Sequence, residues 1–196
     1  FKSEKIFYSG EDLMFDKNLL KGKKILVTGG GSGLGKEMSR HFLTYGAEVI
    51  ICGRRDEVLQ KTATELADET KGNISAHSLD IRDSLAIEET INNIFDEGPL
   101  DGLVNNAAGN FISRTNDLSP NGFNAIASIV FHGTFNMTNT VGKKWIELNK
   151  PGTILSITTT WVWTGSPFVV PSAMSKSGIN AMTKSLAVEW GPHNIR

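Results

Sequence analysis

The sequence predicts a doubly wound α/β fold, in which helices cover both faces of a parallel sheet of five strands. Apolar strand-like runs alternate with helical segments along the chain, and a glycine cluster joins the first strand to the first helix. Short polar side chains also follow several of the expected strand ends. With right-handed crossovers, this alternation gives a Rossmann-type, three-layer αβα architecture with strand order 3-2-1-4-5.

The first βαβ unit follows a stretch of mixed charged and aromatic residues. Lys24–Thr28 is a short apolar run that enters the glycine cluster, Leu34–Tyr45 has helical character, and Glu48–Cys52 is a second strand. The same alternation predicts further strands and helices, one of the helices being long and open to interruption. The further strands are Ile74–Leu79, Leu100–Val104 and Thr153–Ile157, and the further helices are Val58–Glu69, Leu85–Phe95, Pro120–Leu148 and Ala173–Trp190.

We expect residues 1–196 to form a single domain, because this length suits one sizeable core and a hydrophobic content of 39% is ordinary for a globular protein. The chain stops at Arg196, directly after a helix and where the alternation calls for another strand. We therefore expect C-terminal strands and a substrate lid to lie outside this sequence.

The composition argues against several partners and locations. The formal net charge is −1 and the basic residues are scattered, so neither nucleic acid nor an anionic membrane is an expected partner. No apolar stretch approaches the ~20 residues that span a bilayer. The first ten residues contain Glu4 and no apolar block, unlike a signal peptide. We expect a soluble, cytoplasmic protein, with the mitochondrial matrix or the peroxisome as alternatives.

Cysteine and histidine usage adds two expectations. Cys52 is the only cysteine and lies in an apolar run, which favours a buried thiol in a reducing compartment. The four histidines are far apart and lack partners at metal-ligand spacing, so no metal site is predicted.

The segment Thr28–Gly35 reads Thr-Gly-Gly-Gly-Ser-Gly-Leu-Gly and lies between a strand and a helix. Glycines there permit a tight turn and let backbone N–H groups approach a pyrophosphate at the helix N-terminus. A glycine-rich turn with no ligand is the plainer alternative, but the place inside an early βαβ unit favours a dinucleotide. The residues expected to contact it are Gly29, Gly31, Ser32, Gly33 and Leu34.

The end of the second strand indicates which dinucleotide is bound. An enzyme that uses NAD would place an acidic residue there for the ribose 2′-hydroxyl, whereas this sequence continues with Arg54 and Arg55. A guanidinium donates two hydrogen bonds to a phosphate, which a carboxylate would repel. This favours NADP(H), with Arg54 as the contact and Arg55 more simply explained as a solvated surface charge.

Polar residues also follow the third and fourth strands. Asp80 comes after the third, and Asn106, next to Ala107, after the fourth, where strand ends face the ligand crevice, so all three are expected at the cofactor. The polar side chains are expected to reach an adenine amine or to stabilise the sheet edge beside the nicotinamide. Each also suits an ordinary turn.

These elements in this order resemble the short-chain dehydrogenase/reductase family, over nearly the whole chain from Lys21 to Arg196. In that family, a Tyr-x3-Lys pair normally transfers the proton, with a serine upstream and an asparagine in the long helix. Here Lys176 matches the lysine, while Ser172 holds the tyrosine position and Thr159 the upstream serine position. The asparagine position falls near Val130, so the usual tetrad is missing.

One branch of the family has the same departures. The stretches Asn106–Ser113 and Phe168–Ala173 are similar to those of the 2,4-dienoyl-CoA reductases. That resemblance implies NADPH-dependent reduction of a 2,4-dienoyl-CoA to a trans-3-enoyl-CoA, in fatty acid β-oxidation. The resemblance also implies that Asn110 bonds the thioester oxygen and that Lys176 bonds the nicotinamide ribose. Ser172 would help to orient the site, and Phe111 and Ser119 would contact the acyl-CoA.

Trp161 occupies the position of that branch's proton-donating tyrosine. An indole N–H donates a hydrogen bond but is far too weak an acid to release a proton. Trp161 either holds the enolate while water protonates it, or, with Trp163, forms an apolar wall or a subunit contact.

Trp161, in place of the tyrosine, leaves two other functions open. One is an enzyme that acts on another enoyl- or 3-oxoacyl-thioester, and the other is a catalytically idle homologue that binds NADP(H). Family resemblance also implies a homotetramer through Pro120–Leu148 and Ala173–Trp190. Apolar residues of these helices equally suit an intrachain core, namely Ile126, Ile129, Met182 and Leu186.

Overall fold

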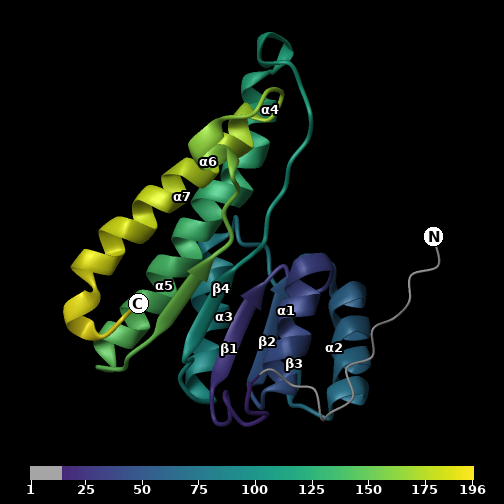
Figure 1. The fold of residues 1–196 in the computed structure, drawn as a ribbon, viewed down its shortest axis with the longest axis vertical. Coiled ribbons are helices and arrows are strands. Elements are labelled where there is room, and N and C mark those ends of the chain that lie inside the picture. Colours follow the sequence, from purple (N-terminus) through teal and green to yellow (C-terminus); the bar gives the residue numbers. More distant parts are fainter. Residues whose placement is uncertain (1–14) are drawn as a thin grey trace.

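A computed structural model describes residues 15–196 and contains one five-stranded parallel sheet (Figure 1). The strand order is β3-β2-β1-β4-β5, which confirms the predicted fold class and order. The predicted strand limits agree with the observed ones to within two residues. The strands are β1 (Lys24–Thr28), β2 (Glu48–Gly53), β3 (Ile74–Ser78), β4 (Gly102–Asn105) and β5 (Thr153–Ser156).

Helices connect the strands, and α4, α6 and the start of α7 extend beyond the carboxyl ends of the strands (Figure 1). The short helix α6 and two 3₁₀ turns, η1 and η3, are not predicted from the sequence. The other elements are α1 (Gly33–Thr44), α2 (Asp56–Thr70), α3 (Ser84–Asp96), α4 (Pro120–Ala127), the π-helical η2 (Ser128–Gly133), α5 (Thr134–Glu147) and α7 (Val170–Glu189); the unpredicted ones are η1 (Thr115–Asp117), α6 (Trp161–Thr164) and η3 (Gly191–His193).

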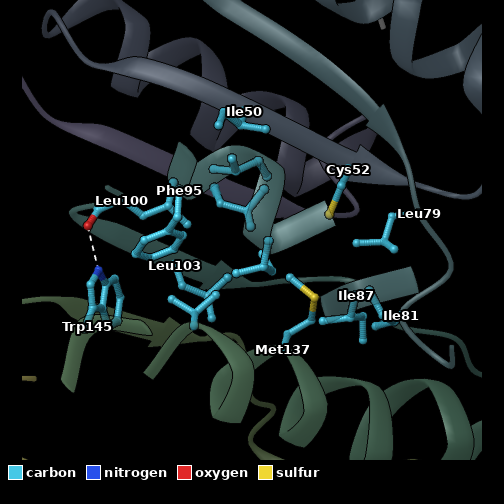
Figure 2. Close-up of a cluster of buried hydrophobic side chains, with 14 of the residues drawn as sticks. Ile50, Cys52, Leu79, Ile81, Ile87, Phe95, Leu100, Leu103, Met137 and Trp145 are labelled. Carbon is cyan, nitrogen blue, oxygen red and sulfur yellow. Dashed lines mark hydrogen bonds between the residues drawn. The ribbon is translucent and has the colours of Figure 1, made fainter. Parts of the chain in front are cut away.

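Alternate residues of each strand point to opposite faces, and each face has its own core. Ile25 and Val27 of β1 belong to the cluster that packs under α1 and α2. Leu26, between them, belongs to a second cluster with residues of α3 and α5. Figure 2 shows this second cluster, in which the Trp145 indole donates a hydrogen bond of 2.6 Å to the Leu100 carbonyl. The two cores explain why the central strands β1, β2 and β4 are mostly buried, whereas the edge strands β3 and β5 carry polar and exposed residues.

The predicted long helix Pro120–Leu148 changes type in its middle instead of breaking. α4 runs directly into the π-helical η2, and η2 into α5. Gly133 at the end of η2 lies against Ile81, since a Cβ added there would be 2.7 Å from Ile81 Cδ1. A π-helical turn adds a residue to the helix, which shifts the following turns relative to their neighbours.

Helix α7 begins at Val170, three residues before its predicted start at Ala173. Pro171 lies in its first turn, where a missing backbone N–H costs nothing. Four apolar residues of the two predicted long helices suited either a tetramer contact or the intrachain core, and all four contribute to the intrachain core. Ile126 is buried in one cluster, and Ile129 and Met182 pack against it. Ile129 and Leu186 also pack against the cluster of Figure 2.

The expectation that the first ten residues are not a signal peptide falls outside the described residues. From residue 15 onward, no helix is both long enough and apolar enough to cross a membrane. Cys52 is fully buried in β2, as its sequence context predicts.

Candidate functional site

A cavity of about 460 Å³ lies where the carboxyl ends of the strands meet the loops that follow them. The strand order reverses beside β1, which has β2 on one side and β4 on the other, and ligands of doubly wound folds bind at this switch point. All the predicted cofactor-binding residues except Gly33 line the cavity: Gly29, Gly31, Ser32, Leu34, Arg54, Asp80, Asn106, Ala107 and Lys176.

The glycine turn between β1 and α1 forms one wall of this cavity. Gly29 and Gly33 have φ angles of +67° and +54°, which residues with a Cβ adopt only with strain. Gly35 has no space for a side chain, because its Cβ would lie 2.4 Å from the Gly29 carbonyl oxygen. Ser32 precedes α1 without capping it, so no serine hydroxyl occupies the first free N–H groups of the helix. A phosphate oxygen suits that position.

Hydrogen bonds from the loop after β4 hold the glycine turn in place. The Thr28 hydroxyl accepts from the backbone N–H groups of Asn106 and Ala107, both at 3.0 Å. The Asn106 amide donates to the carbonyl oxygens of Thr28, at 3.0 Å, and Gly29, at 3.3 Å. Asn106 therefore supports the turn, a role that the sequence indicated only as stabilisation of the sheet edge.

Arg54 and Arg55 follow β2 and lie exposed at the rim of the cavity. Within residues 15–196, neither forms an ion pair with a carboxylate. Their guanidinium groups are therefore available to an anionic ligand. The two residues that directly follow β2 are thus both basic, and neither is acidic.

Asp80 lines the cavity after β3 and is tied to Arg82. The Arg82 guanidinium donates to both carboxylate oxygens, with Nε at 3.0 Å from each and Nη2 at 2.5 Å from Oδ2. The Arg82 backbone N–H also donates to Oδ1 at 3.0 Å. The hydrogen bonds from Arg82 hold the pKa of the Asp80 carboxyl below its usual value, so Asp80 is a carboxylate at neutral pH.

Lys176 reaches the cavity from α7. Its side chain is buried, and its ammonium donates a hydrogen bond to the Ile157 carbonyl at the end of β5. Burial lowers the pKa of Lys176 below its ordinary value. Ser172 is also buried, one helical turn earlier on the same side of α7, but does not line the cavity.

The residues predicted to meet the substrate lie outside this cavity. Asn110 and Phe111 follow β4, and Trp161 begins the short α6. The two loops that carry them are joined, because the Ser113 N–H donates to the Phe168 carbonyl at 3.0 Å. Ser119 caps α4, where its hydroxyl accepts from the Gly122 N–H at 3.0 Å. The structure thus brings the predicted cofactor residues together around one cavity, while Asn110, Phe111 and Ser119 are exposed and Trp161 is half-buried outside it.

Sequence reasoning missed the apolar part of the wall and the partner of Asp80. The strand-end rule used for Asp80 could also have found Leu79, Ile81 and Thr158, which follow β3 and β5. Ile129 belongs to η2, and no local signal indicates that it reaches the cavity. The other unpredicted lining residues are Gly53, Arg55, Val58, Leu59, Ala108 and Ile157.

In the part of the chain that the structure describes, no three His, Cys, Asp or Glu side chains gather to hold a metal ion. The cavity instead has the parts that a dinucleotide requires: a turn that binds phosphate, a basic rim, and apolar walls for flat rings.

Known proteins share this fold and are similar in sequence. The sequence profile of the short chain dehydrogenase family matches residues 23–196. A crystal structure of a short chain dehydrogenase from Bacillus anthracis superposes with a TM-score of 0.86 and 42% identity, over 90% of this chain and 72% of that one.

Two curated relatives come from Caenorhabditis elegans. An uncharacterised oxidoreductase is 43% identical over 98% of this chain and 62% of its own length. A protein named a probable 2,4-dienoyl-CoA reductase that produces (3E)-enoyl-CoA is 46% identical over 90% of this chain and 58% of its own. The chain therefore spans about three fifths of the length of these relatives.

Proposed function

The chain belongs to the short-chain dehydrogenase family, and on that premise we propose that it is the nucleotide-binding part of an NADPH-dependent reductase of unsaturated fatty acyl-CoA. The observation that carries the cofactor choice is Arg54, an unpaired cation within the described residues, at the rim of the cavity where an NAD enzyme would carry an acid. The substrate class rests on the relative named a probable 2,4-dienoyl-CoA reductase and on the stretches Asn106–Ser113 and Phe168–Ala173.

The cofactor-binding residues fit this proposal. The glycine turn and the N-terminus of α1 would hold the pyrophosphate, Arg54 would bind the 2′-phosphate, and Asp80 would accept a hydrogen bond from the adenine amine; all of these line the cavity. When bound, NADPH supplies the hydride. Lys176 binds the nicotinamide ribose with its ammonium, which the Ile157 carbonyl already orients.

The substrate side would work through oxyanion donors. A hydride added at the far end of the conjugated diene leaves negative charge on the thioester oxygen, which Asn110 holds with its amide N–H. Trp161 adds a second N–H donor but cannot release a proton at neutral pH. Water near Lys176 then donates a proton to the carbon next to the thioester, the Lys176 ammonium returns a proton to the hydroxide left behind, and the trans-3-enoyl-CoA results; Lys176 regains its proton from solvent.

Trp161 favours a second candidate, a homologue that binds NADP(H) and turns over this substrate slowly or not at all. Trp161→Tyr supplies an acidic phenol at the same place. A large gain in dienoyl-CoA reduction by this variant supports the idle homologue. Native activity that Trp161→Tyr does not increase supports the reductase.

The test is NADPH oxidation by the purified protein with a 2,4-dienoyl-CoA, beside a saturated acyl-CoA and beside NADH. We expect turnover only with the dienoyl-CoA and NADPH. Arg54→Ala should raise the Kd of NADPH at least about tenfold, through loss of a charged hydrogen bond, and leave the Kd of NADH unchanged. Lys61→Ala is the matched control, a cation on the exposed side of α2. Equal weakening of both cofactors by Arg54→Ala would contradict the assignment of the 2′-phosphate.

A further inference from the structure

Arg82 is bound to the cavity residue Asp80, and the proposed function leaves it without a role. It lies two residues after Asp80, in the turn that joins β3 to α3. Its guanidinium and its backbone N–H together make four donor contacts with the Asp80 carboxylate, between 2.5 and 3.0 Å. The turn itself is closed by the Asp83 N–H, which donates to the Asp80 carbonyl at 2.9 Å.

These contacts fix the orientation of the carboxylate, not only its charge. A planar guanidinium that spans both oxygens sets the plane of the carboxylate, whereas a single contact would let it rotate. A carboxylate has about four lone-pair directions, so some remain available to a ligand. The Asp80 side chain is 31% exposed and lines the cavity, where a ligand can reach these directions.

Arg82 also limits which cation Asp80 binds. Arg54 also lines the cavity, and its charge helps to lower the pKa of the Asp80 carboxyl. Without Arg82, Arg54 would be the remaining cation that acts on this carboxylate, and a pair between them would neutralise the cation that the proposed function assigns to the 2′-phosphate. With Arg82 in place, the Asp80 charge is already compensated and Arg54 has no carboxylate partner within the described residues.

We propose that Arg82 is a positioning residue for the adenine ring: it holds the Asp80 carboxylate so that a free lone pair accepts the adenine 6-amino group. This inference rests on the proposed NADPH site and adds the residue that orients one of its contacts. It requires a bidentate fork, so lysine cannot fully replace Arg82.

The experiment compares NADPH with its analogue in which hypoxanthine replaces adenine, so that a carbonyl oxygen stands in place of the amino group. Kd values for the purified protein come from nicotinamide fluorescence titration without any acyl-CoA. We expect the native protein to bind NADPH about five- to tenfold tighter than the analogue, as one charged hydrogen bond permits.

In Arg82→Gln, the ratio of the two Kd values should fall to within about twofold of one, and in Arg82→Lys it should be intermediate. In Asp80→Ala, the ratio of the two Kd values should be about one, and the double variant Asp80→Ala/Arg82→Gln should have the same ratio as Asp80→Ala. Lys61→Gln removes an exposed cation elsewhere in the chain and should keep the native ratio.

Three results would overturn the inference. Arg82→Gln with a native ratio, but with both Kd values raised, would make Arg82 a general source of positive potential. A native protein that binds the two dinucleotides equally would remove the adenine contact itself. If the native protein bound neither dinucleotide, the proposed NADPH site would be rejected, and the inference with it. This failure is distinguishable from a failure of the inference about Arg82, because it is seen in the native protein without any variant.

Discussion

At the scale of single residues, burial decides the chemistry of Lys176. Its ammonium lies in the interior with a carbonyl as hydrogen-bond partner and no carboxylate beside it within the described residues. Burial disfavours the charged form and lowers the pKa of Lys176 from its ordinary 10.5. The buried ammonium is therefore held by a single carbonyl and loses its proton at a lower pH than an exposed lysine does.

This shift predicts a pH dependence of stability. Between the lowered pKa of folded Lys176 and 10.5, the unfolded chain binds more protons than the folded one, so the free energy of unfolding should rise with pH in that window. Lys176→Met has no proton to exchange and should lack this part of the rise. Urea unfolding at a series of pH values measures it. Native and variant curves that stay parallel up to pH 10.5 would show that burial does not shift this pKa.

Cys52 is governed by burial in the same way. Burial raises the pKa of its thiol to about 12, so almost no thiolate forms at neutral pH. We expect a thiol-specific reagent to label the native protein no faster than it unfolds, and to label the urea-unfolded protein at once. Rapid labelling of native Cys52 would mean that β2 opens to solvent.

At the scale of elements, Ser119 has a structural role in α4 that differs from the substrate contact that the family resemblance implies. Ser119 is expected to contact acyl-CoA, and the structure places its hydroxyl on the first turn of α4 as an N-cap. Both roles are compatible, because a serine hydroxyl that accepts one hydrogen bond still has a hydrogen to donate. Contact with acyl-CoA remains a prediction.

Two substitutions of Ser119 separate these roles. Ser119→Ala should lower the free energy of unfolding by about 1 kcal/mol, because the Gly122 N–H loses its acceptor, whereas Ser119→Asp should keep the cap. Chemical unfolding measures the cap, and the KM for acyl-CoA measures the substrate contact. A negative charge at a CoA contact should raise the KM in Ser119→Asp. An unchanged KM would leave Ser119 as a cap alone.

At the scale of the whole molecule, the core under α3 and α5 joins the two halves of the sheet. Residues of β1, β2 and β4 meet residues of both helices in the cluster that Figure 2 shows. Trp145 is fully buried at its edge and is the donor for the Leu100 carbonyl, in the turn that leads into β4. Gly152 leaves room for its ring, since a Cβ there would lie 2.4 Å from the indole.

Trp145→Phe should therefore destabilise the whole fold. The Leu100 carbonyl would remain buried without a donor, which costs about 1–3 kcal/mol of unfolding free energy in addition to the loss of packing. Trp163→Phe is the matched control, since Trp163 is 72% exposed and should change the unfolding free energy by less than about 0.5 kcal/mol. Similar midpoints of urea unfolding for the two variants would show that the indole bond contributes little.

The sequence alone determined the strand order and nine of the residues that line the cavity, for a physical reason. Apolar periodicity is imposed by burial on one or both faces of an element, and glycine or arginine at a strand end reflects local backbone and charge requirements. The glycine turn and Arg54 can therefore be predicted from a few neighbouring residues of the sequence, and both line the cavity. The single-domain organisation and the homotetramer stay predictions.

Only the tertiary structure decided what depends on contacts between distant segments. Gly133, at the end of the π-helical η2, lies against Ile81, some fifty residues earlier in the chain, and the local sequence does not indicate this contact. The bond from Lys176 to Ile157 and the support of the glycine turn by Asn106 likewise join separate elements. Such contacts depend on how the sheet and helices pack together in three dimensions, which the one-dimensional pattern of apolar and polar residues does not specify.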